Sequence, residues 1–174
     1  MRKLYSSRNN LSSRGSTTIK DEQGKVVYLL TGRWGMHPAA MSVYDIDGVL
    51  LAEIKQRSLG LLPKFELFEQ HKLVGSLRRY YGVGHEMLFI QKLNWFILGN
   101  SLTFNYKIYH GRTCILSLHE VELSSGKFLE LQITHQDDEP LCICVVAILD
   151  FWAKSSSGSH AHQQQGHLHI SFDS

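Results

Sequence analysis

The residues with the clearest chemical pattern are cations that gather in the first half of the chain. They are Lys55, Arg57, Lys64, Arg78 and Arg79. Three leucines (Leu59, Leu61 and Leu62) lie in the segment 58–63, between Arg57 and Lys64. Cations that flank apolar side chains can bind anionic lipid headgroups while the apolar groups insert at the headgroup boundary, each cation contributing about 1 kcal/mol near the surface.

A hairpin would bring these residues together. On the strand before the segment 58–63, Lys55 and Arg57 share one face, and Lys64 begins the strand after it. Antiparallel pairing about 58–63 places Arg57 opposite Lys64, both outward, and the next strand returns to the same end at Arg78 and Arg79. The sequence therefore predicts a basic end with Lys55 at its margin. The alternative, that the three leucines fold inward and cap the end, is compatible with this cluster.

Two short motifs resemble metal sites. Asp45-x-Asp47-Gly48 resembles the start of a calcium loop, but position 54, where the loop needs Glu, is Ile. A hairpin turn is the better interpretation. Cys142-x-Cys144 lies on a predicted helix, where residues two apart point to different faces, so we expect no shared metal ion.

Further motifs give weak indications. His160, His162, His167 and His169 lie in a polar C-terminal segment, and we expect any metal binding there to be incidental. The run Arg78-Arg79-Tyr80-Tyr81 could suit single-stranded nucleic acid, but two arginines are too few to predict it. The sequence contains no Gly-x-Ser-x-Gly, Walker or His-Glu-x-x-His motif. We therefore expect no enzyme, no cofactor, no metal and no nucleic-acid partner.

Composition agrees with one globular domain. The 174 residues are 43% hydrophobic and 20% charged, with a net charge of +2. Residues 1–80 hold 13 Lys and Arg against 7 Asp and Glu, whereas residues 81–174 hold 5 against 9, which gives the molecule a basic side. Three cysteines, an odd number, and no apolar core after Met1–Tyr5 favour a cytoplasmic protein, peripheral at a membrane if the cations bind lipid.

The sequence pattern of residues 1–135 predicts short antiparallel strands. Twelve segments are rich in β-branched and aromatic residues, and several alternate with period two. They are 2–6, 16–20, 25–31, 41–45, 49–55, 64–69, 72–78, 86–91, 94–98, 104–109, 112–119 and 128–134. Turns begin at Asp21, Asp45 and Glu69, at intervals of 24 residues, which indicates a meander of sequential neighbours.

One segment predicts a helix. Asp137-Asp138-Glu139-Pro140 is a typical helix start, and residues 141–153 are apolar on every side except at Asp150. A helix that is apolar all round must be enclosed. Twelve strands in a closed barrel leave an interior too wide for side chains alone, so we expect helix 140–153 to fill it. This predicts a domain over 1–154 and a disordered His-, Ser- and Gln-rich tail over 155–174.

The chain resembles the LURP-one-related proteins, which share the tubby C-terminal-like fold with phospholipid scramblases. The resemblance covers about residues 1–154. It rests on Val43-Tyr-Asp-Ile-Asp-Gly48, on Leu59-Gly-Leu-Leu-Pro-Lys-Phe-Glu-Leu-Phe68, on Leu93-Asn-Trp-Phe-Ile-Leu-Gly-Asn100, and on the apolar helix after Asp137-Asp138.

The resemblance implies an all-β fold, a twelve-stranded barrel around a buried C-terminal helix, and relatives that bind phosphoinositides or scramble lipids. It transfers no site residue. We expect a non-catalytic protein that binds anionic phospholipid of the phosphoinositide kind. A cytoplasmic scaffold for an unknown protein partner and an activity related to lipid scrambling stay open as alternatives, and the sequence predicts no oligomeric state.

Overall fold

The computed structural model describes residues 1–7, 15–33, 39–58, 64–80, 86–100 and 103–163. The side chains of Arg33, of residues 78–80, of Glu86 and of residues 155–163 lie outside this description. Leu59, Leu61 and Leu62 lie outside it altogether, so the choice between a capping and a lipid-facing loop stays a prediction.

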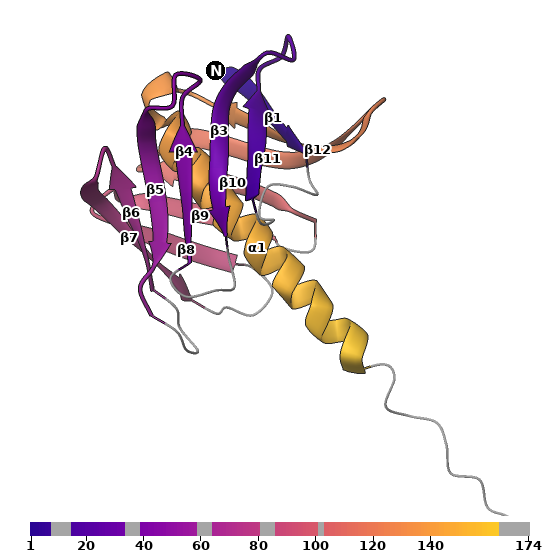
Figure 1. The fold of residues 1–174 in the computed structure, drawn as a ribbon. Coiled ribbons are helices and arrows are strands. Elements are labelled where there is room, and N and C mark those ends of the chain that lie inside the picture. Colours follow the sequence, from indigo (N-terminus) through magenta and orange to yellow (C-terminus); the bar gives the residue numbers. More distant parts are fainter. Residues whose placement is uncertain (8–14, 34–38, 59–63, 81–85, 101–102, 164–174) are drawn as a thin grey trace, which may run out of the picture.

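Twelve antiparallel strands close into one barrel, as predicted (Figure 1). Each strand pairs with its neighbours in sequence, and β1 closes the barrel against β12 over the pairs from Arg2↔Ile133 to Ser7↔Phe128. The strands are β1 (Arg2–Ser7), β2 (Gly15–Lys20), β3 (Val26–Arg33), β4 (Ala40–Tyr44), β5 (Leu50–Gln56), β6 (Lys64–Glu69), β7 (Lys72–Tyr80), β8 (Glu86–Gln91), β9 (Trp95–Asn100), β10 (Asn105–His110), β11 (Thr113–Leu123) and β12 (Gly126–Ile133).

Two of the predicted turns share one geometry. Asp21 Oδ1 accepts hydrogen bonds from the backbone N–H groups of Gln23 and Lys25, and Asp45 Oδ1 accepts them from Asp47 and Val49. A glycine with positive φ, Gly24 or Gly48, completes each turn. The Asp45 carboxylate is therefore occupied in closing a hairpin, as the sequence predicts.

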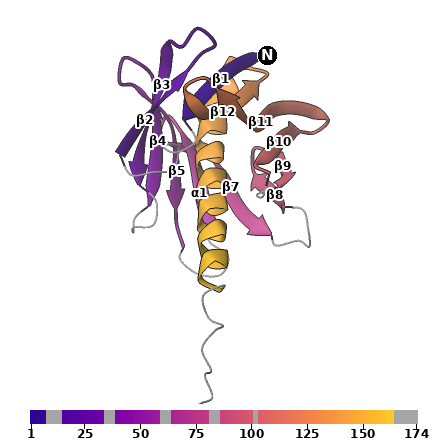
Figure 2. The same ribbon diagram turned by 90° about the vertical axis from the view of Figure 1, so that its right-hand side faces the viewer.

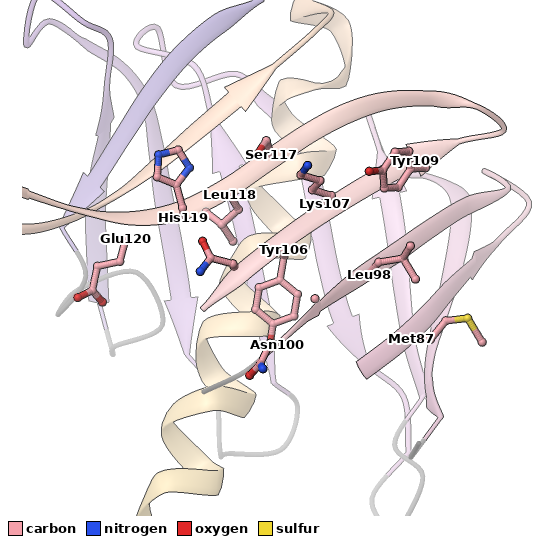
Figure 3. Close-up of a pocket in the computed structure, with 12 residues that line it drawn as sticks. Met87, Leu98, Asn100, Tyr106, Lys107, Tyr109, Ser117, Leu118, His119 and Glu120 are labelled. Atoms are coloured by element: carbon pink, nitrogen blue, oxygen red, sulfur yellow. The ribbon is translucent and has the colours of Figure 1, made fainter. Parts of the chain in front are cut away.

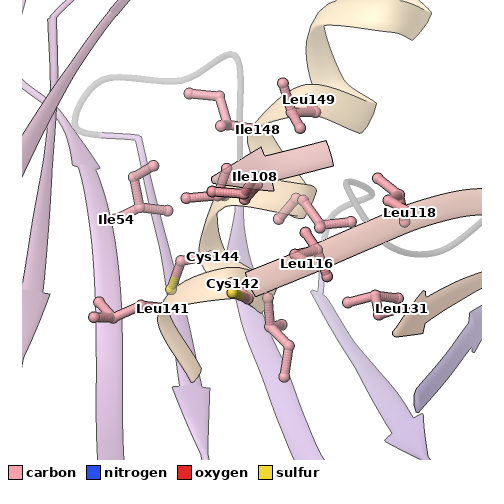
Figure 4. Close-up of a cluster of buried hydrophobic side chains, with 14 of the residues drawn as sticks. Ile54, Ile108, Leu116, Leu118, Leu131, Leu141, Cys142, Cys144, Ile148 and Leu149 are labelled. Carbon is pink, nitrogen blue, oxygen red and sulfur yellow. The ribbon is translucent and has the colours of Figure 1, made fainter. Parts of the chain in front are cut away.

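The helix α1 (Glu139–Gln163) follows a short 3-10 turn, η1 (Gln136–Asp138), and runs along the inside of the barrel (Figure 2). Residues 141–150 are all buried, and their side chains interdigitate with inward-facing residues of the strands, among them Ile54, Ile108 and Leu131 (Figure 4). The predicted filling of the barrel by an apolar helix is confirmed. Burial raises the pKa of the Cys142 and Cys144 thiols, so both stay protonated in the core.

The predicted end of the helix at residue 153 is wrong. Burial ends there, since Ala153 is buried and Lys154 is exposed, but the helical backbone continues to Gln163, outside the barrel (Figure 1). Forming the first turn is the costly step of helix formation, whereas each further residue adds one backbone hydrogen bond. A helix that starts in the buried segment can therefore continue into the polar residues that follow it. The domain boundary at 154 stays a prediction.

Glu139 connects the start of α1 to the barrel through two hydrogen bonds. Its buried Oε2 accepts hydrogen bonds from Tyr28 Oη at 2.7 Å and from Arg2 Nη1 at 3.1 Å. Burial raises the pKa of Glu139 above its usual value, outweighing the hydrogen bond from Tyr28 and the charge of Arg2, which lower it. No helix among the described residues has both the length and the apolarity to cross a membrane.

Candidate functional site: a basic rim and an apolar groove

Backbone pairing brings three positions of the predicted basic cluster together at the end of the barrel where α1 emerges. The Arg57 N–H donates to the Lys64 carbonyl at 2.9 Å, and Lys64 pairs in register with Arg78. Arg57, Lys64 and Arg78 thus hold neighbouring positions on three consecutive strand segments. Lys55 lies on β5, two residues before Arg57 in the chain. We call these four residues the basic rim. The predicted pairing of Arg57 with Lys64 is confirmed.

Arg79 differs from the rim. Its register partner is Leu88, a buried residue of β8, whereas Arg78 pairs with the outward-facing positions of its neighbours. Successive positions on a strand alternate between the two faces of the sheet, so the position of Arg79 on β7 is not on the same face as that of Arg78. The side chains of both arginines lie outside the described residues, so their predicted role in the cluster stays a prediction.

Two glutamates share the described cations of the rim. Glu66 accepts from Arg57 Nε at 2.7 Å and from Lys64 Nζ at 3.0 Å, and Glu53 Oε2 lies 3.0 Å from Lys55 Nζ. Lys55 and Arg57 also lie over the Phe68 ring, 4.9 and 5.6 Å from its centroid. The hydrogen bonds from Arg57 and Lys64 lower the pKa of Glu66, so it is ionised at neutral pH.

A second surface feature was not predicted. A groove of about 890 Å³ lies on the outer face of β8–β11 (Figure 3). Its lining includes the exposed Met87 and Leu98, the half-buried Tyr109, and three polar groups, Lys107, Ser117 and His119. Beside it Phe96 is 43% exposed and packs on Phe89, with 4.7 Å between ring centroids.

The signal for this groove is present in the sequence. Only the inward face of a barrel strand is buried by the helix, so a strand that is apolar at consecutive positions must expose apolar side chains. Positions 87–90 (Met-Leu-Phe-Ile) and 95–98 (Trp-Phe-Ile-Leu) are apolar without alternation. Their burial alternates nonetheless: Leu88 and Ile97 are fully buried, whereas Met87 and Leu98 are 56% and 45% exposed.

A polar network borders the groove. Glu130 on β12 accepts from Gln132 Nε2 at 2.6 Å and from Tyr5 Oη at 2.8 Å, and lies 3.4 Å from Lys3 Nζ and 3.5 Å from His119 Nε2. Burial alone would raise the pKa of Glu130, but the hydrogen bonds from Gln132 and Tyr5 and the charges of Lys3 and His119 together lower it. The Glu130 carboxylate therefore has four polar neighbours, one of which is His119 of the groove lining.

The hydroxyl and thiol groups of the described residues were candidates for nucleophiles. None of them is hydrogen-bonded to His119; Cys114 Sγ donates to the Leu116 carbonyl and Thr134 Oγ1 to the Cys114 carbonyl. In the same part of the chain no three His, Cys, Asp or Glu side chains lie close enough together to hold a metal ion. The side chains of His160 and His162, and all of His167 and His169, are outside the description.

Comparisons with known proteins agree with this architecture. The model of the family described as LURP-one-related matches residues 2–150. The protein YxjI of Bacillus subtilis, itself uncharacterised, is 24% identical over 150 residues, which span 86% of this chain and 93% of YxjI.

A crystal structure of an Arabidopsis thaliana protein superimposes with a TM-score of 0.57 at 17% identity, covering 86% of this chain and 89% of the other. At that identity the superposition supports the fold alone. The family match extends over nearly the whole barrel and most of the buried helix. The chain belongs to the LURP-one-related family.

Proposed function

We propose that this protein is a non-catalytic, peripheral binder of anionic phospholipid, and that the basic rim contacts the headgroups. One observation carries the proposal: Arg57, Lys64 and Arg78 occupy paired positions on three neighbouring strand segments at one end of the barrel. A phosphate-bearing surface that meets this end would face all three positions together. The lipid-handling relatives implied by the family resemblance support the same class of ligand.

The ion pairs of the rim set the expected strength of binding. Glu53 and Glu66 neutralise two of the three charges on Lys55, Arg57 and Lys64, so these five side chains contribute a net charge of only one, to which Arg78 adds another. Each basic residue near an anionic membrane is worth about 1 kcal/mol, so binding depends on many weak contacts. It should weaken steeply above physiological salt, where the Debye length falls below about 8 Å.

Sedimentation with vesicles tests the proposal. Vesicles of phosphatidylcholine alone, with phosphatidylserine, and with a phosphoinositide are compared for the wild type and for the variant Arg57→Glu, Lys64→Glu, Arg78→Glu. The matched control reverses three exposed cations at the opposite end of the barrel, Lys25, Lys72 and Arg112.

Binding to anionic vesicles that only the rim variant loses supports the proposal. Equal and negligible binding to all vesicles overturns it, and equal loss in both variants reduces it to an effect of net charge.

A protein-interaction module is the second candidate, because one observation favours it. Met87, Phe96 and Leu98 expose apolar side chains on two neighbouring strands, as a docking surface for a protein would. A partner bound there would bury Leu98, so the variant Leu98→Asp should lose the partner and keep its binding to vesicles. The absence of binding to anionic vesicles, together with that loss, would favour this candidate.

The filled interior supports the non-catalytic part of the proposal. The space that would form a deep substrate pocket in a barrel of this width is occupied by α1, whose residues 141–150 are buried throughout. A hydrolase or transferase site would have to lie on the outer surface. Turnover that depends on His119 would contradict this part of the proposal.

A further inference from the structure

The two sides of the groove on β8–β11 differ in chemistry: one side is apolar and the other is cationic. Strand register places four outward side chains in one line across the barrel, Met87↔Leu98, Leu98↔Lys107 and Lys107↔Ser117. Neighbouring strands lie about 4.8 Å apart, so Lys107 is about 10 Å from Met87 along this line. Apolar side chains occupy β8 and β9, whereas an ammonium and a hydroxyl occupy β10 and β11 (Figure 3).

A second line, parallel to the first, widens the apolar side. Phe89 on β8 pairs with Phe96 on β9, and Phe96 pairs with Tyr109 on β10. Below these lines the floor is formed by the backbone of Gly99 and by the buried Tyr106 and Leu118. A Cβ at Gly99 would collide with the Tyr106 ring, so this glycine lets the ring pack directly on β9.

Lys107 has no acidic partner within the described part of the chain, unlike Lys55, Arg57 and Lys64 of the rim. The other titratable groups of the groove have partners: His119 Nε2 lies 3.5 Å from Glu130 Oε1, and Glu120 Oε1 lies 3.2 Å from Lys127 Nζ. The Lys107 ammonium is therefore the charge in the groove that an incoming anion can neutralise. One apolar line of side chains leads to one cation that has no acidic partner among the described residues. This arrangement matches a molecule with one chain and one negative charge.

We propose that this groove binds a single-chain organic anion of the long-chain carboxylate class. The chain lies across β9 and β8 over Leu98 and Met87, with Phe96 and Tyr109 at its side, and the carboxylate accepts hydrogen bonds from Lys107 Nζ and the Ser117 hydroxyl. A volume of about 890 Å³ lies within the range of small-molecule sites, about 300–1,000 Å³. The site is separate from the rim and does not depend on the proposal made for it.

The strand pairing argues against an extended peptide as the occupant. Each of β8, β9, β10 and β11 is hydrogen-bonded to a neighbour on both sides, so a peptide cannot add to this part of the sheet as a further strand. It would have to bind through side chains alone. A small amphiphile needs only the apolar lines and the cation.

Titrations with monomeric ligands of one chain length test the proposal. Decanoate, decanol and decyltrimethylammonium carry the same chain on an anionic, a neutral and a cationic head. Methyl resonances of Met87 and Leu98 report where each one binds. The variants are Leu98→Asp, Lys107→Glu and the conservative Lys107→Arg, with Lys25→Glu as an exposed control outside the groove. Thermal unfolding of each variant verifies that it is folded.

We expect decanoate to bind most tightly and decyltrimethylammonium least tightly, with shifts of the Met87 and Leu98 methyl resonances. Affinity should rise about twofold per methylene from octanoate to dodecanoate, because an open groove buries only part of each CH₂. Lys107→Glu should weaken decanoate about tenfold and leave decanol unchanged, whereas Lys107→Arg and Lys25→Glu keep the wild-type affinity.

Several outcomes overturn the proposal. Equal affinity for the three heads in the wild type would show unspecific adsorption on an apolar surface, and this comparison needs no variant. Unshifted Met87 and Leu98 resonances would place any bound ligand elsewhere. Self-association that Leu98→Asp abolishes, without binding of decanoate, would show that a second copy of the chain covers this face.

Discussion

The basic rim and the groove differ in how their charges are used. At the rim, Arg57 and Lys64 share the Glu66 carboxylate and Lys55 lies against Glu53, so two carboxylates balance two of the four cationic charges. In the groove, Lys107 has no acidic partner among the described residues and stands beside exposed apolar groups. The region with more cations therefore offers less uncompensated charge per cation.

A count of cations in a sequence therefore does not measure the charge that is available to a ligand. Outward positions of neighbouring strands lie about 5 Å apart, which is close enough for a glutamate on the same face to pair with them. Glu66 shares a face with Lys64 two residues away, and this could be read from the alternation of β6. The rim was predictable in position, but its balance of charge depends on rotamers that the sequence does not specify.

The largest effect should come from the helix that supports both regions. Val146 is fully buried inside the barrel, and Val146→Asp would place a charge there without a partner. This costs several kcal/mol against a total stability of about 5–15 kcal/mol, so we expect no soluble folded protein and the loss of both surfaces. Expression, circular dichroism and chemical denaturation measure this.

Leu149→Ala is the milder comparison. It should leave a folded protein that is less stable by about 2–5 kcal/mol, because it removes buried methyl groups and leaves a cavity. A soluble Val146→Asp protein with a cooperative unfolding transition would contradict the role of α1 as the core.

The carboxylates of Glu130 and Glu139 should change the pH dependence of stability in opposite directions. The folded-state pKa of Glu130 is lowered, so its contribution is present above the range where an unfolded Glu titrates and is lost as pH falls through the lowered pKa. Glu130→Gln should cost about 1–3 kcal/mol at neutral pH and progressively less toward acid pH. Urea denaturation between pH 3 and about 8 measures this, within the range where carboxyl groups titrate.

Glu139 should show the opposite sign. Its folded-state pKa is raised, so its contribution is fully present below the range where an unfolded Glu titrates and is lost as pH rises through the raised pKa. Relative to the wild type, Glu139→Gln should therefore gain in stability as pH rises across that window. The same slope in both variants would contradict the two environments described here.

One substitution at the rim should increase its binding to anionic lipid. Glu66→Gln removes the carboxylate shared by Arg57 and Lys64, so their charges become available to anionic lipid. We expect binding to phosphatidylserine vesicles to rise about fivefold, which corresponds to about one charge. Stability should change by less than about 1 kcal/mol, because the Arg57 and Lys64 side chains are partly exposed and solvent screens their ion pairs with Glu66. Glu69→Gln, exposed on the same strand, is the matched control.

The fold was accessible to sequence reasoning because its signals are local. Twelve strands, the Asp-based turns and the start of α1 all follow from alternation, turn residues and helix-start residues. The end of α1 was missed because the end of burial and the end of the helical backbone are different events. The groove was missed because its residues come from four strands and become one surface only through the register.

The smallest effect should come from the groove itself when stability is measured. Leu98→Asp and Lys107→Glu change exposed side chains, so the free energy of unfolding should change by less than about 0.5 kcal/mol. Ile97→Asp, one residue away but fully buried, is the contrast and should unfold the domain. A large loss in Leu98→Asp would show that this side chain supports the fold and is not available to a ligand.

The rim and the groove should bind different ligands independently of each other. Two variants are compared for binding to phosphatidylserine vesicles and to decanoate. The first combines Arg57→Glu, Lys64→Glu and Arg78→Glu, and the second combines Leu98→Asp and Lys107→Glu. We predict that the first variant loses the vesicles and keeps decanoate, and that the second keeps the vesicles and loses decanoate. Loss of both ligands in either folded variant would contradict two independent surfaces.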